Sequence, residues 1–278
     1  MANLKKYKEI IQDFSNNNID TTQVGFYDTP EFISIENNNP SYLQNYAKFV
    51  QLQRYDETYL NMVREKVPFI AEILYKELEK DGRLGACIDV SMTLSRILEK
   101  EGIWNHMVCG SLNIDYPKKS KLPRGHFWSC DISYTNQPIM AAHAWLFVPP
   151  FYVVDLTVKM QQYTLEQVKY LPNFVVSEKT KQYVPKAEDL INTIVVRDYK
   201  QRGFNDILSK LIPNFKSFNS IFPAVSTKYS ETTLHYIPTS ISAPDAPFEQ
   251  AINLKLNGKY GNEIYKEIIQ PALKENGF

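Results

Sequence analysis

The chain of 278 residues has little that would mark a secreted, membrane or nucleic-acid-binding protein. Its three cysteines are too few for a disulfide framework, and their odd number leaves at least one thiol free under any pairing. Lysine plus arginine equals aspartate plus glutamate at 31 each, so no global charge favours nucleic acid as a partner. There is no apolar run of about 18 residues and no signal-peptide pattern. We therefore expect no membrane contact and a cytoplasmic location, or secretion by a route that needs no classical signal.

Glycine is also scarce, and no glycine-rich phosphate loop or dinucleotide fingerprint occurs. The best candidate for a metal site is the set Cys109, His126, Cys130 and Asp131. No C-x-x-C or H-x-x-x-H pair supports it, although zinc sites usually have such pairs. The sequence therefore predicts neither a cofactor nor a metal.

The order of the predicted elements favours an α+β fold, in which helices precede several antiparallel strands. Apolar spacings of three and four predict helices over residues 3–14, 42–80 and 88–101. Pro68 is expected to divide the second of these. Aromatic and β-branched residues predict strands over 104–114, 126–133, 142–148 and 151–157. The later chain predicts helices near 165–170, from about 186 and over 262–274, with a proline-broken polar region over 213–247.

Three regions follow from this order. Residues 1–80 form a helical N-terminal region, residues 81–180 form the core, and residues 181–278 form a mostly helical region packed on that core. The two outer regions are expected to shape a substrate groove.

Three residues in the core region provide the parts of a nucleophilic site. Cys87 opens a predicted helix, His143 lies in the strand segment AAHAWLFV, and Asp155 lies in FYVVDLT. A thiol reacts as the thiolate, which an imidazolium and a helix N-terminus both favour. A carboxylate then fixes the tautomer and orientation of the imidazole. Cys87 is accordingly the candidate nucleophile, His143 its base and Asp155 the group that orients the base.

The turn between the two strands decides whether this triad can form. A two-residue turn at Pro149 and Pro150 would send Asp155 to the face opposite His143, because side chains alternate along a strand. A three-residue turn would place the two residues directly across from each other. The catalytic interpretation therefore requires an odd-numbered loop or a bulge.

Two further residues are candidates for substrate binding. Trp145 shares the face of His143 and is expected either to shield the imidazole and carboxylate from water or to be ordinary core. Arg124 ends the basic, proline-broken run YPKKSKLPRG, which either forms a solvated loop or acts as a lid or substrate clamp.

These residues resemble the transglutaminase-like branch of the papain-fold cysteine enzymes. The resemblance rests on G-x-C at Gly85, a helix that ends in G-I, V-x-G at Val108, H-A-W at His143 and V-V-D-x-T at Val153. It covers roughly residues 82–157. A weaker resemblance links R-L-G-A-C to the R-G-G-x-C motif of arylamine N-acetyltransferases.

The resemblance implies a papain/transglutaminase-like core with a Cys-His-Asp triad at Cys87, His143 and Asp155. It further implies acyl transfer from an amide of a peptide or protein through a thioester, with water or an amine as acceptor. Hydrolysis, deamidation and transamidation share the first half-reaction and stay open. The second oxyanion donor is unassigned, since the nearest upstream glutamine, Gln53, is distant in sequence. The alternative is a catalytically inactive module of this fold that binds a protein partner.

Overall fold

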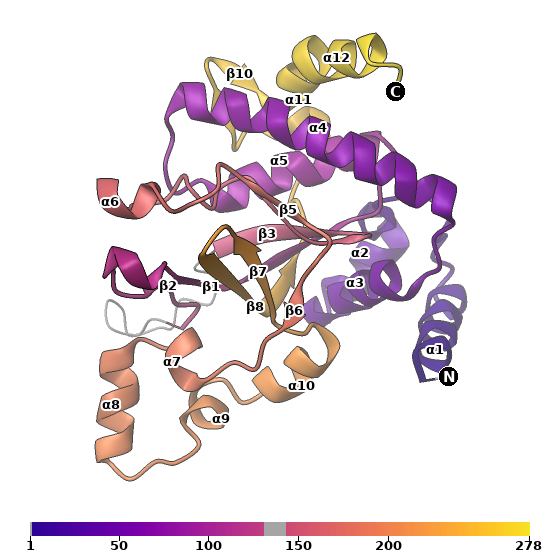
Figure 1. Ribbon diagram of the computed structural model, residues 1–278. Helices are drawn as coiled ribbons and strands as arrows, with labels where there is room; N and C mark the ends of the chain where they lie inside the picture. The colour runs from indigo at the N-terminus through magenta and orange to yellow at the C-terminus, as the bar shows by residue number, and fades with distance from the viewer. Residues whose placement is uncertain (1, 131–142) are drawn as a thin grey trace.

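The computed structural model of the chain describes residues 2–130 and 143–278. An antiparallel sheet forms its centre, and helices cover both faces of the sheet (Figure 1). The α+β class predicted from the sequence is therefore confirmed. Parts of two predicted strands, residues 131–133 and residue 142, lie outside the described residues.

The central sheet has eight strands in the order β5-β4-β3-β1-β8-β7-β6, with β2 paired to β1. The strands span, in chain order, β1 His106–Asp115, β2 Gly125–Phe127, β3 His143–Val148, β4 Phe151–Asp155, β5 Val175–Ser177, β6 Lys181–Gln182, β7 Val225–Tyr229 and β8 Thr232–Ser242. A separate hairpin pairs β9, Lys255–Leu256, with β10, Lys259–Tyr260.

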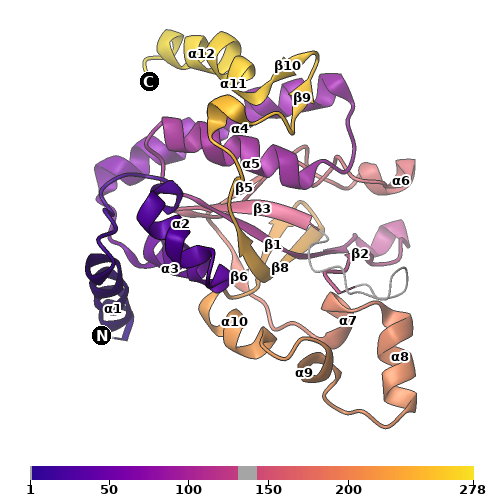
Figure 2. The same cartoon turned by 180° about the vertical axis from the view of Figure 1, so that it is seen from behind.

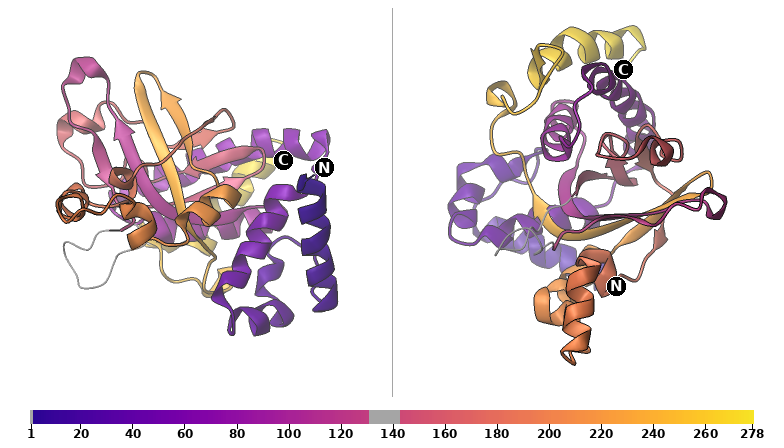
Figure 3. Two further views of the ribbon diagram at one scale, coloured as in Figure 1. Left: turned by 90° about the horizontal axis from the view of Figure 1, so that it is seen from below. Right: turned by 90° about the vertical axis from the view of Figure 1, so that its left-hand side faces the viewer.

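Two long helices, α4 (Glu57–Asp81) and α5 (Cys87–Lys100), cover one face of the sheet (Figures 1 and 3). The C-terminal segment packs outside them as α11 (Gly261–Ile264), a π-helical turn over Tyr265–Ile269 and α12 (Gln270–Glu275). The predicted apolar side of α5, which includes Leu94 and Ile97, is buried in this layer. Burial of that side holds α5 against β1 and β3.

Shorter helices cover the opposite face and one end of the sheet (Figures 1 and 2). They are α1 Ala2–Asn16, α2 Pro30–Glu36, α3 Leu43–Leu52, α6 Leu165–Val168, α7 Ala187–Leu190, α8 Thr193–Gln201, α9 Ile207–Leu211 and α10 Phe215–Ile221. The helices α1 to α3 enclose an aromatic cluster around Phe14 and Phe26. Within the described residues, no helix is both long and apolar enough to cross a membrane.

The predicted division of residues 42–80 at Pro68 is wrong. Pro68 lies inside α4 without ending it, and the break comes between Leu52 and Glu57. Asp56 caps α4 there by accepting a hydrogen bond from the Tyr59 N–H at 2.7 Å. An interior proline costs about 3 kcal/mol, and burial of the apolar side chains around it in the layer beneath α4 offsets this cost.

The prediction of a polar region over residues 213–247 is also wrong. It contains β7 and β8, and β8 pairs with β1 at the middle of the sheet. Pro238 interrupts the strand pattern in the sequence, but it lies next to an irregularity in the β1–β8 pairing at Cys109 and Gly110, where a ladder can accommodate proline. The region 181–278 is therefore partly built into the core sheet.

Candidate active site

Cys87 is the first residue of α5, as the sequence predicted. The preceding residue, Ala86, has no side chain that can cap the helix. The first-turn N–H groups of a helix have no partner within the helix, and their partial positive charge favours an anion. The sulfur of Cys87 therefore lies where a helix terminus favours a thiolate.

His143 and Asp155 meet in the interior of the protein. The Nε2 atom of His143 lies 2.7 Å from Oδ2 of Asp155, and neither side chain has any exposed surface. His143 opens β3 and Asp155 ends β4, so the two adjacent strands place them at the same edge of the fold.

A β-bulge in the β3–β4 pairing brings His143 and Asp155 to the same face of the sheet. Val148 pairs with Phe151 across the Pro149–Pro150 turn, which alone would separate the two faces. The register then shifts between Val148 and Leu146, and Leu146 pairs with Val154. In the shifted register Asp155 lies across from Trp145 and diagonal to His143 on the same face. The sequence analysis required an odd-numbered loop or a bulge for His143 and Asp155 to share a face, and the structure has the bulge. The two residues are diagonal neighbours and do not lie directly opposite each other.

The Asp155 carboxylate is held by two further residues. Oδ1 accepts hydrogen bonds from the Thr157 N–H at 2.8 Å and from the Thr157 hydroxyl at 3.0 Å. Oδ2 accepts a hydrogen bond from the buried Tyr236 hydroxyl at 2.9 Å, in addition to its contact with His143. These donors fix the carboxylate in one orientation and stabilise its charge.

The histidine and the aspartate form an ion pair. Burial alone would lower the pKa of His143, but the charge of Asp155 and the hydrogen bond to it raise that pKa to about 10. Burial likewise opposes ionisation of Asp155, whereas His143, Thr157 and Tyr236 together hold the pKa of Asp155 below its usual value. The imidazole is therefore held as an imidazolium at neutral pH.

Cys87 lies next to this imidazolium. The Nδ1 atom of His143, which Asp155 does not use, makes no hydrogen bond of standard geometry to the described residues. The Cys87 side chain is nevertheless close enough that hydrogen bonding and charge interaction with it contribute to the raised pKa of His143. Nδ1 is thus the nitrogen of the His143 ring that Asp155 leaves unused.

Aromatic rings enclose the imidazole. Trp145 stacks beside it with ring centroids 6.2 Å apart, and the Tyr236 and Phe127 rings lie at 6.4 Å and 6.3 Å. Trp145 is only 2% exposed, so it packs in the core beside His143 and offers little surface to a substrate. Low local polarity of this kind strengthens the His143–Asp155 interaction.

The open side of the site lies at the entry to α5. Cys87 itself is 7% exposed, whereas Leu84 and Ile88 are exposed by 54% and 39%. The backbone of Gly85 is left-handed, with φ of 76°, and a Cβ atom added there would meet no other atom within 4 Å. The exposed apolar side chains of Leu84 and Ile88 therefore lie close in sequence to the largely buried Cys87.

Arg124 lies away from this triad. Its guanidinium pairs with Asp189 at 2.6 Å and Asp115 at 2.8 Å, and donates a hydrogen bond to the Tyr183 hydroxyl at 3.1 Å. Its charge is therefore already neutralised by protein carboxylates. Its role as a substrate clamp stays a prediction without a contact to the triad.

The residues of the candidate metal site are not grouped around a common point in the described part of the chain. His126 contacts the Asn113 side chain at 2.7 Å, and burial raises the pKa of Cys109 to about 12. Asp131 lies outside the described residues. In the described ranges, no three His, Cys, Asp or Glu side chains are grouped so that they could hold a metal ion.

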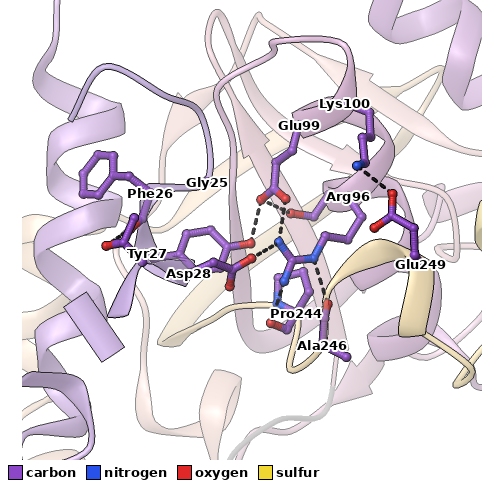
Figure 4. A network of polar contacts seen from close by, with 12 residues as sticks. Gly25, Phe26, Tyr27, Asp28, Arg96, Glu99, Lys100, Pro244, Ala246 and Glu249 are labelled. Carbon is purple, nitrogen blue, oxygen red and sulfur yellow. Dashed lines mark hydrogen bonds and ion pairs between the residues drawn. The ribbon is translucent and has the colours of Figure 1, made fainter. Parts of the chain in front are cut away.

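A polar network fixes the far half of α5 (Figure 4). Arg96 pairs with Glu99 at 2.9 Å and with Asp28, and it donates hydrogen bonds to the backbone oxygens of Ala246 at 3.1 Å and Pro244 at 3.3 Å. It thereby ties the helix that carries the thiol to both terminal regions of the chain.

Sequence reasoning missed Tyr236, which approaches the triad from β8. Its only sequence signal was the alternation of Leu234 and Tyr236 within a segment bounded by prolines. Comparison with protein-family models, with curated proteins and with solved structures finds no match to this chain.

Proposed function

We propose that the protein is a cysteine-dependent acyl-transfer enzyme with a papain/transglutaminase-like arrangement, acting on an amide of a peptide or protein. The observation that carries the proposal is the buried contact of 2.7 Å between His143 and Asp155, with Cys87 beside the same imidazole at the start of α5. Burial of an ion pair is costly, and such pairs with shifted pKa values concentrate at functional sites.

The chemistry follows from these positions. The His143 imidazolium favours the thiolate of Cys87, which attacks the carbonyl carbon and forms an S–C bond. The carbonyl oxygen becomes an oxyanion, and the tetrahedral intermediate then collapses. The leaving amine takes a proton from Nδ1 of His143, and a thioester remains on Cys87. Water or an amine next donates its proton to His143 and attacks the thioester carbon. The C–S bond then breaks, the acyl product leaves, and Cys87 is released as the thiolate beside the His143 imidazolium.

Backbone donors at the start of α5 are suited to the oxyanion. The first-turn N–H groups have no side-chain cap at Ala86, so they are free to donate to a negative oxygen beside the sulfur. Asp155 takes no proton in this scheme. It orients the imidazole and stabilises its charge.

A trapping experiment tests the proposal. Protein incubated with p-nitrophenyl acetate should gain one acetyl group by intact mass, and the adduct should map to the peptide that contains Cys87. Cys87→Ala and His143→Ala should each abolish the adduct, while Asp155→Asn should slow its formation by a smaller factor. Cys109→Ala is the matched control, because Cys109 is a buried thiol for which residues 2–130 and 143–278 provide no imidazole partner, and this variant should acetylate like wild type.

Two results would count against catalysis. An adduct on Cys87 that forms equally fast in His143→Ala would show that the imidazole does not activate the thiol. Complete lack of acylation in a folded protein would favour the alternative, a module that keeps the triad geometry and binds a protein partner. Addition of amines after trapping then separates acyl transfer to an amine from hydrolysis.

A further inference from the structure

The buried hydroxyl of Tyr236 shares one acceptor atom with the imidazole of His143. Oδ2 of Asp155 accepts a hydrogen bond from the Tyr236 hydroxyl at 2.9 Å and lies 2.7 Å from Nε2 of His143. A carboxylate oxygen can only accept, so the hydroxyl and the ring nitrogen both direct a proton at the same atom. The two donors therefore compete for the charge of one oxygen.

Tyr236 is held firmly at this oxygen. It pairs with Leu112 of β1 on one side and with Val225 of β7 on the other, and its side chain has no exposed surface. Its ring packs against Trp145 with centroids 5.1 Å apart. Phenylalanine in this place would keep the ring packing and would remove only the hydrogen bond.

The Tyr236 hydroxyl remains a donor at alkaline pH. Burial, together with the charge of Asp155, raises the pKa of Tyr236 well above its usual value. The phenol therefore keeps its proton through the range in which His143 loses its own.

Two thiols of neighbouring elements titrate near the imidazole. Cys87, the first residue of α5, contributes to the raised pKa of His143. Cys109 of β1 stays a neutral thiol, because burial raises its pKa to about 12. Neither thiol bonds to Asp155 in the part of the chain that the structure describes.

A second buried tyrosine lies near the same carboxylate without donating to it. Tyr163, which precedes α6, packs against Phe127, one of the rings around the imidazole, with centroids 5.6 Å apart. Its hydroxyl donates to the backbone oxygen of Val158 at 2.7 Å. Tyr163 is therefore a matched comparison for Tyr236.

We propose that Tyr236 is a positioning residue that sets the alkaline limit of acyl transfer, through the Asp155 oxygen that it shares with His143. The hydroxyl bonds more strongly to the carboxylate once the imidazolium has lost its proton, because the carboxylate charge is then no longer neutralised. It thereby favours the neutral imidazole and lowers the pH at which His143 is deprotonated. The pH limit rests on the proposed function, in which the imidazolium gives its proton to the leaving amine.

Titration of His143 in the folded protein tests this effect without any substrate. Nuclear magnetic resonance of the full chain with ¹³C-labelled histidine follows the ring carbons against pH, and His143→Gln assigns the signal. The Cys87→Ala background removes the thiol that titrates beside the ring. In that background Tyr236→Phe should raise the midpoint by about 0.5–1 pH unit, since only part of the hydrogen-bond energy changes with the protonation of the ring.

Tyr163→Phe in the same background is the matched control. It should leave the midpoint of His143 unchanged, because the Tyr163 hydroxyl bonds to a backbone oxygen and not to Asp155. Circular dichroism at each pH confirms that the compared proteins are folded. Equal midpoints with and without the Tyr236 hydroxyl, a shift to lower pH, or an equal shift in Tyr163→Phe would overturn the proposal.

The rate of acyl transfer by the chain with its thiol gives a second readout. The probe is p-nitroacetanilide, an amide whose leaving aniline must take a proton from the imidazolium. The alkaline fall of kcat/KM should move to higher pH in Tyr236→Phe by the same interval, whereas mere loss of stability would lower the rate without this shift. A raised midpoint of His143 in a protein that transfers no acyl group would count against the proposed function and not against the coupling of Tyr236 to His143.

Discussion

Exchange of His143 for glutamine should change how the stability of the protein depends on pH. The comparison is made in a Cys87→Ala background, between the single variant and Cys87→Ala with His143→Gln. A thiolate with an imidazolium holds the same number of protons as a thiol with a neutral imidazole, so protonation of His143 by Cys87 would not change the proton count of the folded protein. Removal of the thiol excludes this transfer. The difference between the two proteins then reports the protonation of His143 together with that of Asp155, its ion-pair partner.

The expected sign follows from the direction of the pKa shift. In the wild-type protein Asp155 and, to a smaller extent, Cys87 raise the pKa of His143 from the usual 6.5 to about 10 against the effect of burial, and in the Cys87→Ala background Asp155 still raises it. The folded state then binds more protons than the unfolded state between these values. The stabilisation is complete below pH 6.5 and is lost as the pH rises through the raised pKa of the folded state. The slope is at most about 1.4 kcal/mol per pH unit for one proton, which sets an upper limit of about 2 kcal/mol between pH 6.5 and 8.5.

Urea denaturation followed by circular dichroism measures this quantity at several fixed pH values. Cys87→Ala should lose unfolding free energy over this interval relative to the double variant, by up to about 2 kcal/mol. Groups that do not contact His143 titrate equally in both proteins and cancel in the difference, whereas Asp155, whose pKa His143 lowers, does not. Parallel pH profiles would mean that the His143–Asp155 pair binds no extra proton in the folded state, and the ion-pair description of the site would be wrong.

Three further outcomes are expected. Tyr236→Phe should lower the free energy of unfolding by about 1–3 kcal/mol, because the charged carboxylate of the triad loses a hydrogen bond; an unchanged denaturation midpoint would contradict this. Gly110→Ala should destabilise more than Gly125→Ala in thermal unfolding, since the added methyl would lie 2.0 Å from a backbone oxygen of β8 at the first position and 3.3 Å from side-chain atoms at the second. Cys87 should react with iodoacetamide before Cys109, whose pKa burial raises to about 12, and peptide mapping of the reverse order would refute the assigned thiol.

The parts of the fold with strong local signals could be predicted from the sequence. The apolar periodicity of α5, with Leu94 and Ile97 on one side, indicated a helix over residues 88–101, and the observed helix begins and ends one residue earlier, at Cys87 and Lys100. The predicted strand around His143 and the one that ends in Asp155 both formed. In these segments local pattern and tertiary packing agree.

The remaining features depend on contacts that the sequence does not display. Pro68 stays helical because of what packs around it, and Pro238 concealed a strand whose partner is more than a hundred residues earlier. The bulge beside Leu146 was recognised as a requirement, but its position is set by sheet geometry. Tyr236 could not be assigned to the site before β8 was known to cross the sheet beside β1.

The position of β8 also bears on how the chain acquires its site during synthesis. The strand inserts beside β1, which precedes it by more than a hundred residues, and supplies the Tyr236 hydroxyl to Asp155. Pairing of such distant segments is slow, because a long loop must close before the contacts form. A ribosome-bound chain that ends before residue 232 has its nucleophile, base and carboxylate but not the strand that completes their support. The Asp155 carboxylate therefore lacks its hydrogen bond from Tyr236 until β8 has emerged from the ribosome.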